Sequence, residues 1–147
     1  MKVVIQRSKN SNVIINNEIY NKIDKGLVIF SCFTDGDTID DINYIVKKIT
    51  NLRIFDDEFG VMNKSIIDNN GSILSISQFT LYADTKKGNR PSYIKALNGE
   101  ESIKLYDLFN EELNKIVPTF TGVFGADMLV NIENDGPITI IIDSKNK

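Results

Sequence analysis

The residues from Gly26 to Phe33 constrain the fold more than any other part of the chain, because they form a nearly continuous apolar run. A strand with one face in water alternates apolar and polar residues, whereas a strand buried on both faces is apolar along its length. The sequence therefore predicts a central strand over this run, buried on both faces.

Two other stretches have the apolar period of a helix. The apolar residues of the first are Ile39, Ile42, Ile45, Val46, Ile49 and Leu52. The second predicted helix extends from about Gly99 to Val117, directly before Pro118, and its apolar residues are Ile103, Tyr106, Phe109, Leu113 and Ile116. Apolar stripes of this kind usually face a protein core, and we expect both stripes to be buried.

The residue types at the helix starts agree with these two predictions. Either Asp37 or Thr38 can cap the first helix, and Asp41 stands where the partner of a capping box is found. Asn98 is the expected N-cap of the second helix, with Glu101 three residues later.

Runs of β-branched and aromatic residues predict strands before, between and after the helices. In chain order, these strands cover residues 2–7, 12–16, 18–24, 26–33, 71–81, 119–124, 126–133 and 137–143, with a tight turn at Asn16–Asn17 and a further hairpin over residues 53–60. This order predicts one α+β domain over residues 1–147, a small mixed β-barrel or curved sheet covered by two helices.

The composition excludes several kinds of catalytic site. The chain has no histidine, so no histidine-dependent triad or histidine-ligated metal can form within it. Its one cysteine, Cys32, lies in the apolar run and is expected to be a buried structural residue. We expect no metal and no cofactor, and we expect Asp56, Asp57 and Glu58 to form a hydrated turn rather than a cation site. Chemistry would come from hydroxyls, amides, carboxylates, lysines, backbone groups or the substrate.

The charge distribution bears on possible partners. The net charge of −3 argues against a surface made to coat nucleic acid, but Lys86, Lys87, Arg90 and Lys95 form a local basic cluster. Such a cluster suits either a solvated loop or a phosphate contact. No apolar run reaches the roughly 18 residues of a membrane span, and no signal peptide is recognised, so a cytoplasmic protein is expected.

Two segments carry polar groups at places where a site can form. The strand predicted over residues 71–81 becomes polar at its end, where Gln78 and Thr80 share one face and Ser77 and Phe79 face the other way unless the strand kinks. A polar strand end of this kind either places side chains at a functional site or simply extends into solvent. The second segment, Asn134–Thr139, is typical of an Asp-Gly turn followed by an edge strand.

These two segments, Ser77-Gln78-Phe79-Thr80 and Asn134-Asp135-Gly136-Pro137-Ile138-Thr139, together resemble the D-aminoacyl-tRNA deacylase family. Further stretches resemble it as well: Val4–Arg7, Arg53–Phe55, Met62–Asn63, Asn89–Ser92 and Phe124–Met128. The similarity extends from the first predicted strand to the last. The segment Ser31–Asp35 departs from the small-residue, glycine-containing run of the family, which affects packing beside the site but neither motif.

The resemblance implies an enzyme that hydrolyses the ester between tRNA and a D-amino acid or glycine, and so proofreads chirality in translation. It implies a homodimer in which Gly136-Pro137 of one subunit, joined by a cis peptide bond, enters the site of the other and excludes L side chains. Ser77, Gln78, Phe79 and Thr80 would form the catalytic wall. Arg7 would brace the Gly-Pro segment, or form a surface ion pair. Lys86, Lys87 and Arg90 would contact tRNA phosphates.

The chemistry of ester hydrolysis fits these residues in part. Backbone N–H groups around Phe79 and Thr80 are natural donors to a developing oxyanion. Threonine is a weak nucleophile without a neighbouring base, so Thr80 is expected to position the substrate while the ribose 2′-OH helps to orient or activate water. Two alternatives stay open: an esterase acting on another acyl-nucleotide ester, and a dimeric nucleic-acid-binding module without hydrolysis.

Overall fold

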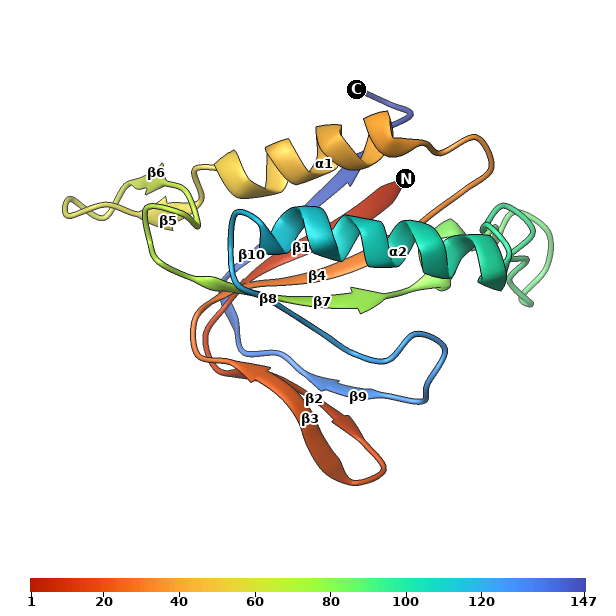
Figure 1. The fold of residues 1–147 in the computed structure, drawn as a ribbon, viewed down its shortest axis with the longest axis horizontal. Helices are drawn as coiled ribbons and strands as arrows, with labels where there is room; N and C mark the ends of the chain where they lie inside the picture. The colour runs from red at the N-terminus through yellow and green to blue at the C-terminus, as the bar shows by residue number, and fades with distance from the viewer.

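The computed structural model describes all of residues 1–147 (Figure 1). A five-stranded mixed sheet lies at its centre, in the order β10-β1-β4-β7-β8. These strands are β1 (Lys2–Ser8), β4 (Gly26–Cys32), β7 (Ser72–Ser77), β8 (Thr119–Thr121) and β10 (Asn134–Asp143). The predicted central strand is confirmed, because β4 occupies the middle position and pairs antiparallel with β1 and parallel with β7.

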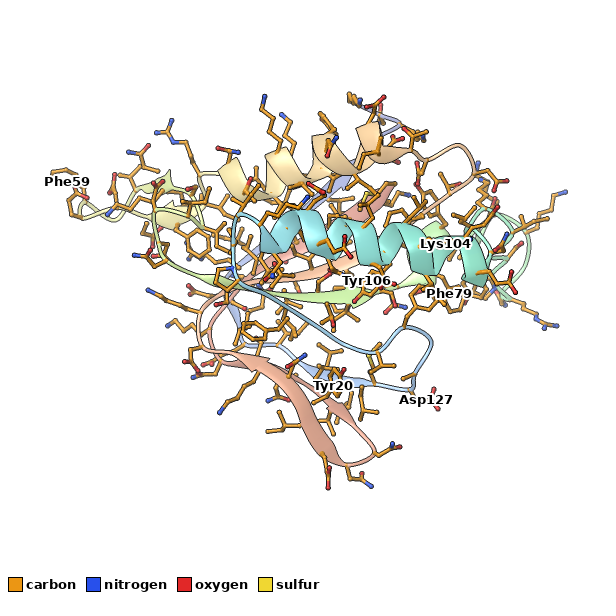
Figure 2. All side chains as sticks on the ribbon, in the orientation of Figure 1. Tyr20, Phe59, Phe79, Lys104, Tyr106 and Asp127 are labelled. Carbon is orange, nitrogen blue, oxygen red and sulfur yellow. The ribbon has the colours of Figure 1, made fainter.

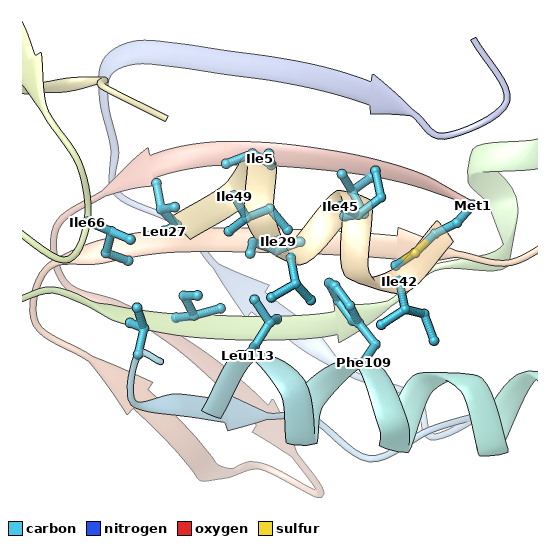
Figure 3. Close-up of a cluster of buried hydrophobic side chains, with 14 of the residues drawn as sticks. Met1, Ile5, Leu27, Ile29, Ile42, Ile45, Ile49, Ile66, Phe109 and Leu113 are labelled. Atoms are coloured by element: carbon cyan, nitrogen blue, oxygen red, sulfur yellow. The ribbon is translucent and has the colours of Figure 1, made fainter. Parts of the chain in front are cut away.

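Two helices, α1 (Ile39–Asn51) and α2 (Gly99–Asn114), cover one face of this sheet (Figures 1 and 3). Both predicted caps are confirmed. Thr38 and Asp41 form a capping box at α1, and the Asn98 side chain accepts the Glu101 amide at α2. The main core lies between the helices and the sheet, where Ile5, Leu27, Ile29, Ile42, Ile45, Ile49, Phe109 and Leu113 are fully buried (Figure 3).

Parts of the predicted apolar stripes are wrong. Ile39, Ile103 and Ile116 are each at least 40% exposed: Ile39 is the first residue of α1, Ile103 lies near the N-terminal end of α2, and α2 ends at Asn114, before Ile116. The remaining residues of both stripes pack into the core.

A second, three-stranded sheet packs on part of the other face. It consists of β2 (Ser11–Ile15), β3 (Glu18–Ile23) and β9 (Leu129–Asn131), in the order β3-β2-β9. The predicted turn joins β2 to β3 at Asn16 and Asn17, both of which have positive φ. A smaller core of Val13, Ile23, Val28, Leu74 and Ile76 lies between the two sheets.

The sheets are open, so the curved-sheet alternative describes the fold and the closed barrel does not. On the face opposite the helices, Ile141 of the edge strand β10 is 68% exposed. A short hairpin, β5 (Phe55–Asp56) and β6 (Met62–Lys64), follows α1 as predicted. None of the helices combines the length and the apolar character needed to cross a membrane.

Candidate active site

The predicted strand over residues 71–81 is wrong at its C-terminal end. β7 stops at Ser77, the Gln78 amide makes a last 2.8 Å hydrogen bond to the Ser31 carbonyl, and the chain then forms a short 3-10 helix, η1 (Phe79–Tyr82). The neighbouring strand β4 ends at Cys32, so a longer β7 would have left its backbone groups without a partner on that side. The strand therefore kinks where its sequence becomes polar.

The kink forms one wall of a cavity of about 290 Å³. Its lining comes from the ends of β4 and β7, from α2 and from the loop before β9: Ser31–Phe33, Ile76–Phe79, Ser102, Phe124–Met128 and Val130. Ser77, Gln78 and Phe79 therefore line the cavity, as expected of site residues. Thr80 lies outside its lining and stays connected to it through Gln78, whose Nε2 donates to Thr80 Oγ1 at 2.6 Å.

Two backbone amides at the start of η1, one of Phe79 in this wall and one of Thr80 next to it, lack a partner within the turn. The first hydrogen bond of η1 runs from the Leu81 amide to the Gln78 carbonyl, so the amides of Phe79 and Thr80 precede it. The Gln78 side chain does not cap them either. Unpaired amides at the start of a helical turn are free to bind a ligand oxygen.

Cys32 belongs to the same cavity lining and contacts η1. The residue is 4% exposed, and its thiol donates to the carbonyl oxygens of Phe33 at 3.5 Å and Phe79 at 3.4 Å. Burial raises the pKa of Cys32 to about 11, so the group is a neutral thiol at physiological pH. This agrees with the expected structural role.

The basic cluster lies on the loop that follows η1. Lys95 pairs with Asp84 at 3.3 Å, and Asp84 also accepts the Lys86 amide. The side chains of Lys86, Lys87 and Arg90 are exposed and form no ion pair in the chain. These three cations are therefore available to an external anion.

Gly136 and Pro137 belong to the first part of β10, and the peptide bond between them is cis. The segment is not the separate turn that its sequence suggests, because Asn134 already pairs with Ser8 of β1. The pairing of β10 with β1 is irregular between this pair and the next one, Gln6 with Thr139. The Asn134 side chain fixes this irregularity by donating to the carbonyls of Arg7 and Ile138, both at 3.0 Å. No role was predicted for Asn134, although it is the first residue of the motif.

Arg7 is 8% exposed and is therefore not a surface ion pair. Its guanidinium donates to the carbonyl of Asp135, next to Gly136, at 3.3 Å and to the carbonyl of Ile54 at 2.8 Å. It also pairs with the carboxylates of Asp56 and Asp135, at 3.3 and 3.2 Å. Asp57 accepts the amides of Phe59 and Val61, so this acidic loop is a hydrogen-bonded turn.

The two motifs lie at opposite ends of the central sheet within one subunit. Ser8, paired with Asn134, also pairs with Gly26 at the start of β4, whereas Ser77 pairs with Ser31 near its end. Gly26 and Ser31 are five positions apart along β4, or about 16 Å at the usual rise of about 3.3 Å per residue. A single subunit therefore does not bring Gly136-Pro137 to the cavity.

The fold and the cavity together define an α+β protein with a binding site whose wall offers main-chain donors to a carbonyl group. A family model described as D-Tyr-tRNA(Tyr) deacylase matches residues 4–143. Two relatives named D-aminoacyl-tRNA deacylase match the whole chain and 99% of their own lengths. The protein of Parabacteroides distasonis is 52% identical over 149 residues, and that of Clostridium novyi is 49% identical over 151 residues.

The chain belongs to the D-Tyr-tRNA(Tyr) deacylase family and is accordingly a hydrolase that acts on aminoacyl-tRNA. A solved structure named "c-Myc DNA Unwinding Element Binding Protein" is 37% identical, with a TM-score of 0.92 over 97% of this chain and 98% of the other. A probable eukaryotic D-amino acid tRNA deacylase, 18% identical, shares the fold with a TM-score of 0.82 over 96% and 97% of the two chains.

Proposed function

We propose that the protein hydrolyses the ester bond of D-aminoacyl-tRNA and of glycyl-tRNA, releasing free tRNA and the amino acid in the cytoplasm. The observation that carries the proposal is the wall formed by Ser77, Gln78 and Phe79, where a family motif meets a cavity and two unpaired amides. The cavity would hold the terminal adenosine and its ester. No metal or cofactor is part of the proposed reaction.

In this mechanism the amides of Phe79 and Thr80 donate to the oxyanion that forms when water attacks the ester carbonyl. Loss of one such donor typically costs about 2.7–4 kcal/mol of transition-state stabilisation in enzymes with an oxyanion hole. Thr80 positions the ester and is not the nucleophile, because its hydroxyl contacts only the neutral amide of Gln78, which is not a base. The neighbouring ribose 2′-OH would orient or activate the attacking water.

We propose further that the active unit is a homodimer in which Gly136-Pro137 enters the cavity of the partner. The separation of the two motifs supports this, because they lie at opposite ends of the central sheet and one subunit cannot bring both to the same cavity. A partly exposed apolar row supports it as well: Ile141 is opposite Val4, and Val4 is opposite Phe30, on the face that the helices do not cover. Ile141 is exposed, Val4 is half-buried, and Phe30 packs in part against the smaller core. A second subunit on this row would bury it.

The same arrangement explains a preference for D-amino acids. Backbone carbonyls of the Gly136-Pro137 segment would hold the substrate α-ammonium, with Arg7 fixing the segment through the Asp135 carbonyl. An L side chain would then collide with the segment, whereas a D side chain would point away, and discrimination would come from a steric clash. Glycine has no side chain and would be accepted.

The tRNA itself would meet the loop after η1. Lys86, Lys87 and Arg90 are exposed and unpaired, and they follow the cavity wall directly in the chain. Cations in this position would contact phosphates near the acceptor end. Such contacts supply affinity without reading sequence.

The direct test is to incubate the purified protein with matched D-tyrosyl-tRNA and L-tyrosyl-tRNA and to measure the release of each amino acid. We expect release from the D ester, from glycyl-tRNA and not from the L ester. Free D-tyrosine ethyl ester serves as the control for a general esterase. Equal hydrolysis of the D and L esters would contradict the proposed discrimination, and hydrolysis of the free ester alone would contradict the tRNA substrate.

A second candidate function, beside hydrolysis, is nucleic-acid binding, favoured by the 37% identity to the c-Myc DNA Unwinding Element Binding Protein. It predicts tight binding of DNA or RNA, and that substitutions at the cavity wall leave this binding unchanged. The net charge of −3 makes it the weaker of the two. Binding of uncharged tRNA and of DNA, measured beside the hydrolysis assay, separates them.

A further inference from the structure

Two aromatic side chains lie exposed together at the rim of the cavity. Phe79 lines the cavity, yet 57% of its surface is exposed; it is labelled in Figure 2. Tyr93 is 38% exposed and packs edge-to-face against Phe79, with ring centroids 5.0 Å apart and an interplanar angle of 77°. Large aromatic rings usually bury most of their surface, so this pair has ring area free for a ligand.

The loop that carries Tyr93 is fixed in place by hydrogen bonds on both sides of it. Asp84 and Ser92 exchange two backbone hydrogen bonds of 2.8 and 2.9 Å. The Leu97 amide donates to the carbonyl of Phe33, a residue of the cavity lining, at 2.9 Å, and Thr34 Oγ1 donates to the Lys95 carbonyl at 2.6 Å. Tyr93 is therefore held against Phe79 by a loop anchored to the cavity wall.

The charges of the same loop indicate the chemistry of the occupant. Lys86, Lys87 and Arg90 lie between the two residues of the Asp84–Ser92 bridge and form no ion pair in the chain. Exposed aromatic rings beside unpaired cations are the combination that binds single-stranded nucleic acid, in which bases stack on rings and phosphates meet the cations. An acidic or purely apolar partner would not need both features.

We propose that Phe79 and Tyr93 form a stacking platform for the base that precedes the terminal adenosine in the single-stranded end of tRNA. This inference rests on the proposed function, which places the terminal adenosine and its ester in the cavity behind Phe79. The next nucleotide leaves the cavity across its rim, where the two rings lie. Its phosphate then faces the loop with the three cations. Tyr93 is thus a binding residue for the nucleic-acid part of the substrate.

The experiment compares two substrates that differ only in the nucleotides beyond the terminal adenosine: D-tyrosyl-tRNA and 3′-O-(D-tyrosyl)adenosine. The variants are Tyr93→Ala and Tyr93→Phe, and Tyr20→Ala is the control because Tyr20 is 52% exposed on β3, in the three-stranded sheet (Figure 2). We expect Tyr93→Ala to raise KM for the tRNA by about 5- to 150-fold, the range for loss of one base–aromatic stack. We expect the rise in KM for 3′-O-(D-tyrosyl)adenosine to be several-fold smaller.

The conservative variant and the oligomeric mass complete the test. Tyr93→Phe keeps the ring and is expected to restore the KM for tRNA, and Tyr20→Ala is expected to behave as the wild type. The platform would be wrong if Tyr93→Ala raised KM equally for both substrates, or if Tyr93→Phe failed to restore the KM for tRNA. It would also be wrong if the oligomeric mass of Tyr93→Ala changed. If the wild-type protein hydrolyses neither substrate, the proposed function itself fails, which is a different result from any of these.

Discussion

At the scale of single residues, main-chain groups supply what the side chains of this site do not. Gln78 and Thr80 contact each other, and neither is a base. The unpaired donors at the cavity wall are the amides of Phe79 and Thr80, and the buried thiol of Cys32 donates to the Phe79 carbonyl. That carbonyl and the Thr80 amide belong to one planar peptide unit and point in opposite directions. Cys32 therefore helps to orient the Thr80 amide.

A hydroxyl that only positions the ester is dispensable to a large degree. We expect Thr80→Val, which removes the hydroxyl and keeps the amide, to lower kcat by about 2- to 10-fold, the effect of one hydrogen bond worth about 0.5–1.5 kcal/mol. The measurement is single-turnover hydrolysis of D-tyrosyl-tRNA, with Thr80→Ser as the matched control that retains the hydroxyl. Loss of all turnover in Thr80→Val, together with an acyl ester trapped on Thr80 of the wild type, would make Thr80 the nucleophile.

At the scale of elements, local sequence predicted the helices well and the end of β7 poorly. The caps at Thr38 and Asn98 involve residues within one turn, so short-range pattern contains the information. Residues 79–82 are aromatic, β-branched or apolar and favour a strand, but they form η1 because the neighbouring strand β4 has already ended. Where a neighbour ends is a tertiary fact that the residues themselves do not specify.

The start of α1 offers a prediction about stability, because Asp41 joins it to the C-terminal segment. Besides closing the capping box, its carboxylate accepts from Ser144 Oγ at 2.6 Å and from Lys145 Nζ at 3.2 Å. Burial alone would raise the pKa of Asp41, but the hydrogen bonds from Ser144, Thr38 and Lys145 outweigh it and hold this pKa well below its ordinary value. The carboxylate form therefore favours the folded state.

We expect Asp41→Asn to lower the free energy of unfolding by about 1–3 kcal/mol at pH 7, measured by urea denaturation. The stabilisation from a depressed pKa is complete above the unfolded value of about 4 and declines as the pH falls toward the folded value. The difference in the free energy of unfolding between the wild type and Asp41→Asn should therefore become smaller below about pH 4. Asp40→Asn, an exposed neighbour in the same turn, is the control, and a difference that stays constant down to pH 2 would contradict the assignment.

At the scale of the whole molecule, the position of one motif relative to the other decides how the site is assembled. Strand pairing places Gly136-Pro137 and Ser77 at opposite ends of β4. The sequence shows both motifs but not this separation, because it follows from the register of β10 on β1 and of β1 on β4, which non-local packing decides. The family resemblance supplied the expectation of a shared site, and the geometry of one subunit now supports it.

A shared site makes a quantitative prediction for mixed subunits. Ala126 lines the cavity, so Ala126→Trp is expected to fill it, and Pro137 is exposed, so Pro137→Arg is expected to block entry of that segment into the partner. Each variant alone should be inactive. After subunit exchange in an equal mixture, half of the dimers contain one copy of each variant, and one of their two sites combines an intact cavity with an intact Gly136-Pro137 segment.

The mixture should therefore regain about one quarter of the wild-type rate on D-tyrosyl-tRNA, since half of the dimers each have one working site of two. Native mass spectrometry of the two variants, distinguished by mass, establishes that mixed dimers have formed. A mixture of Ala126→Trp with wild type controls for exchange itself and should retain half of the wild-type rate. Mixed dimers without recovered activity would show that each subunit completes its own site, and the cross-subunit role of Gly136-Pro137 would then be wrong.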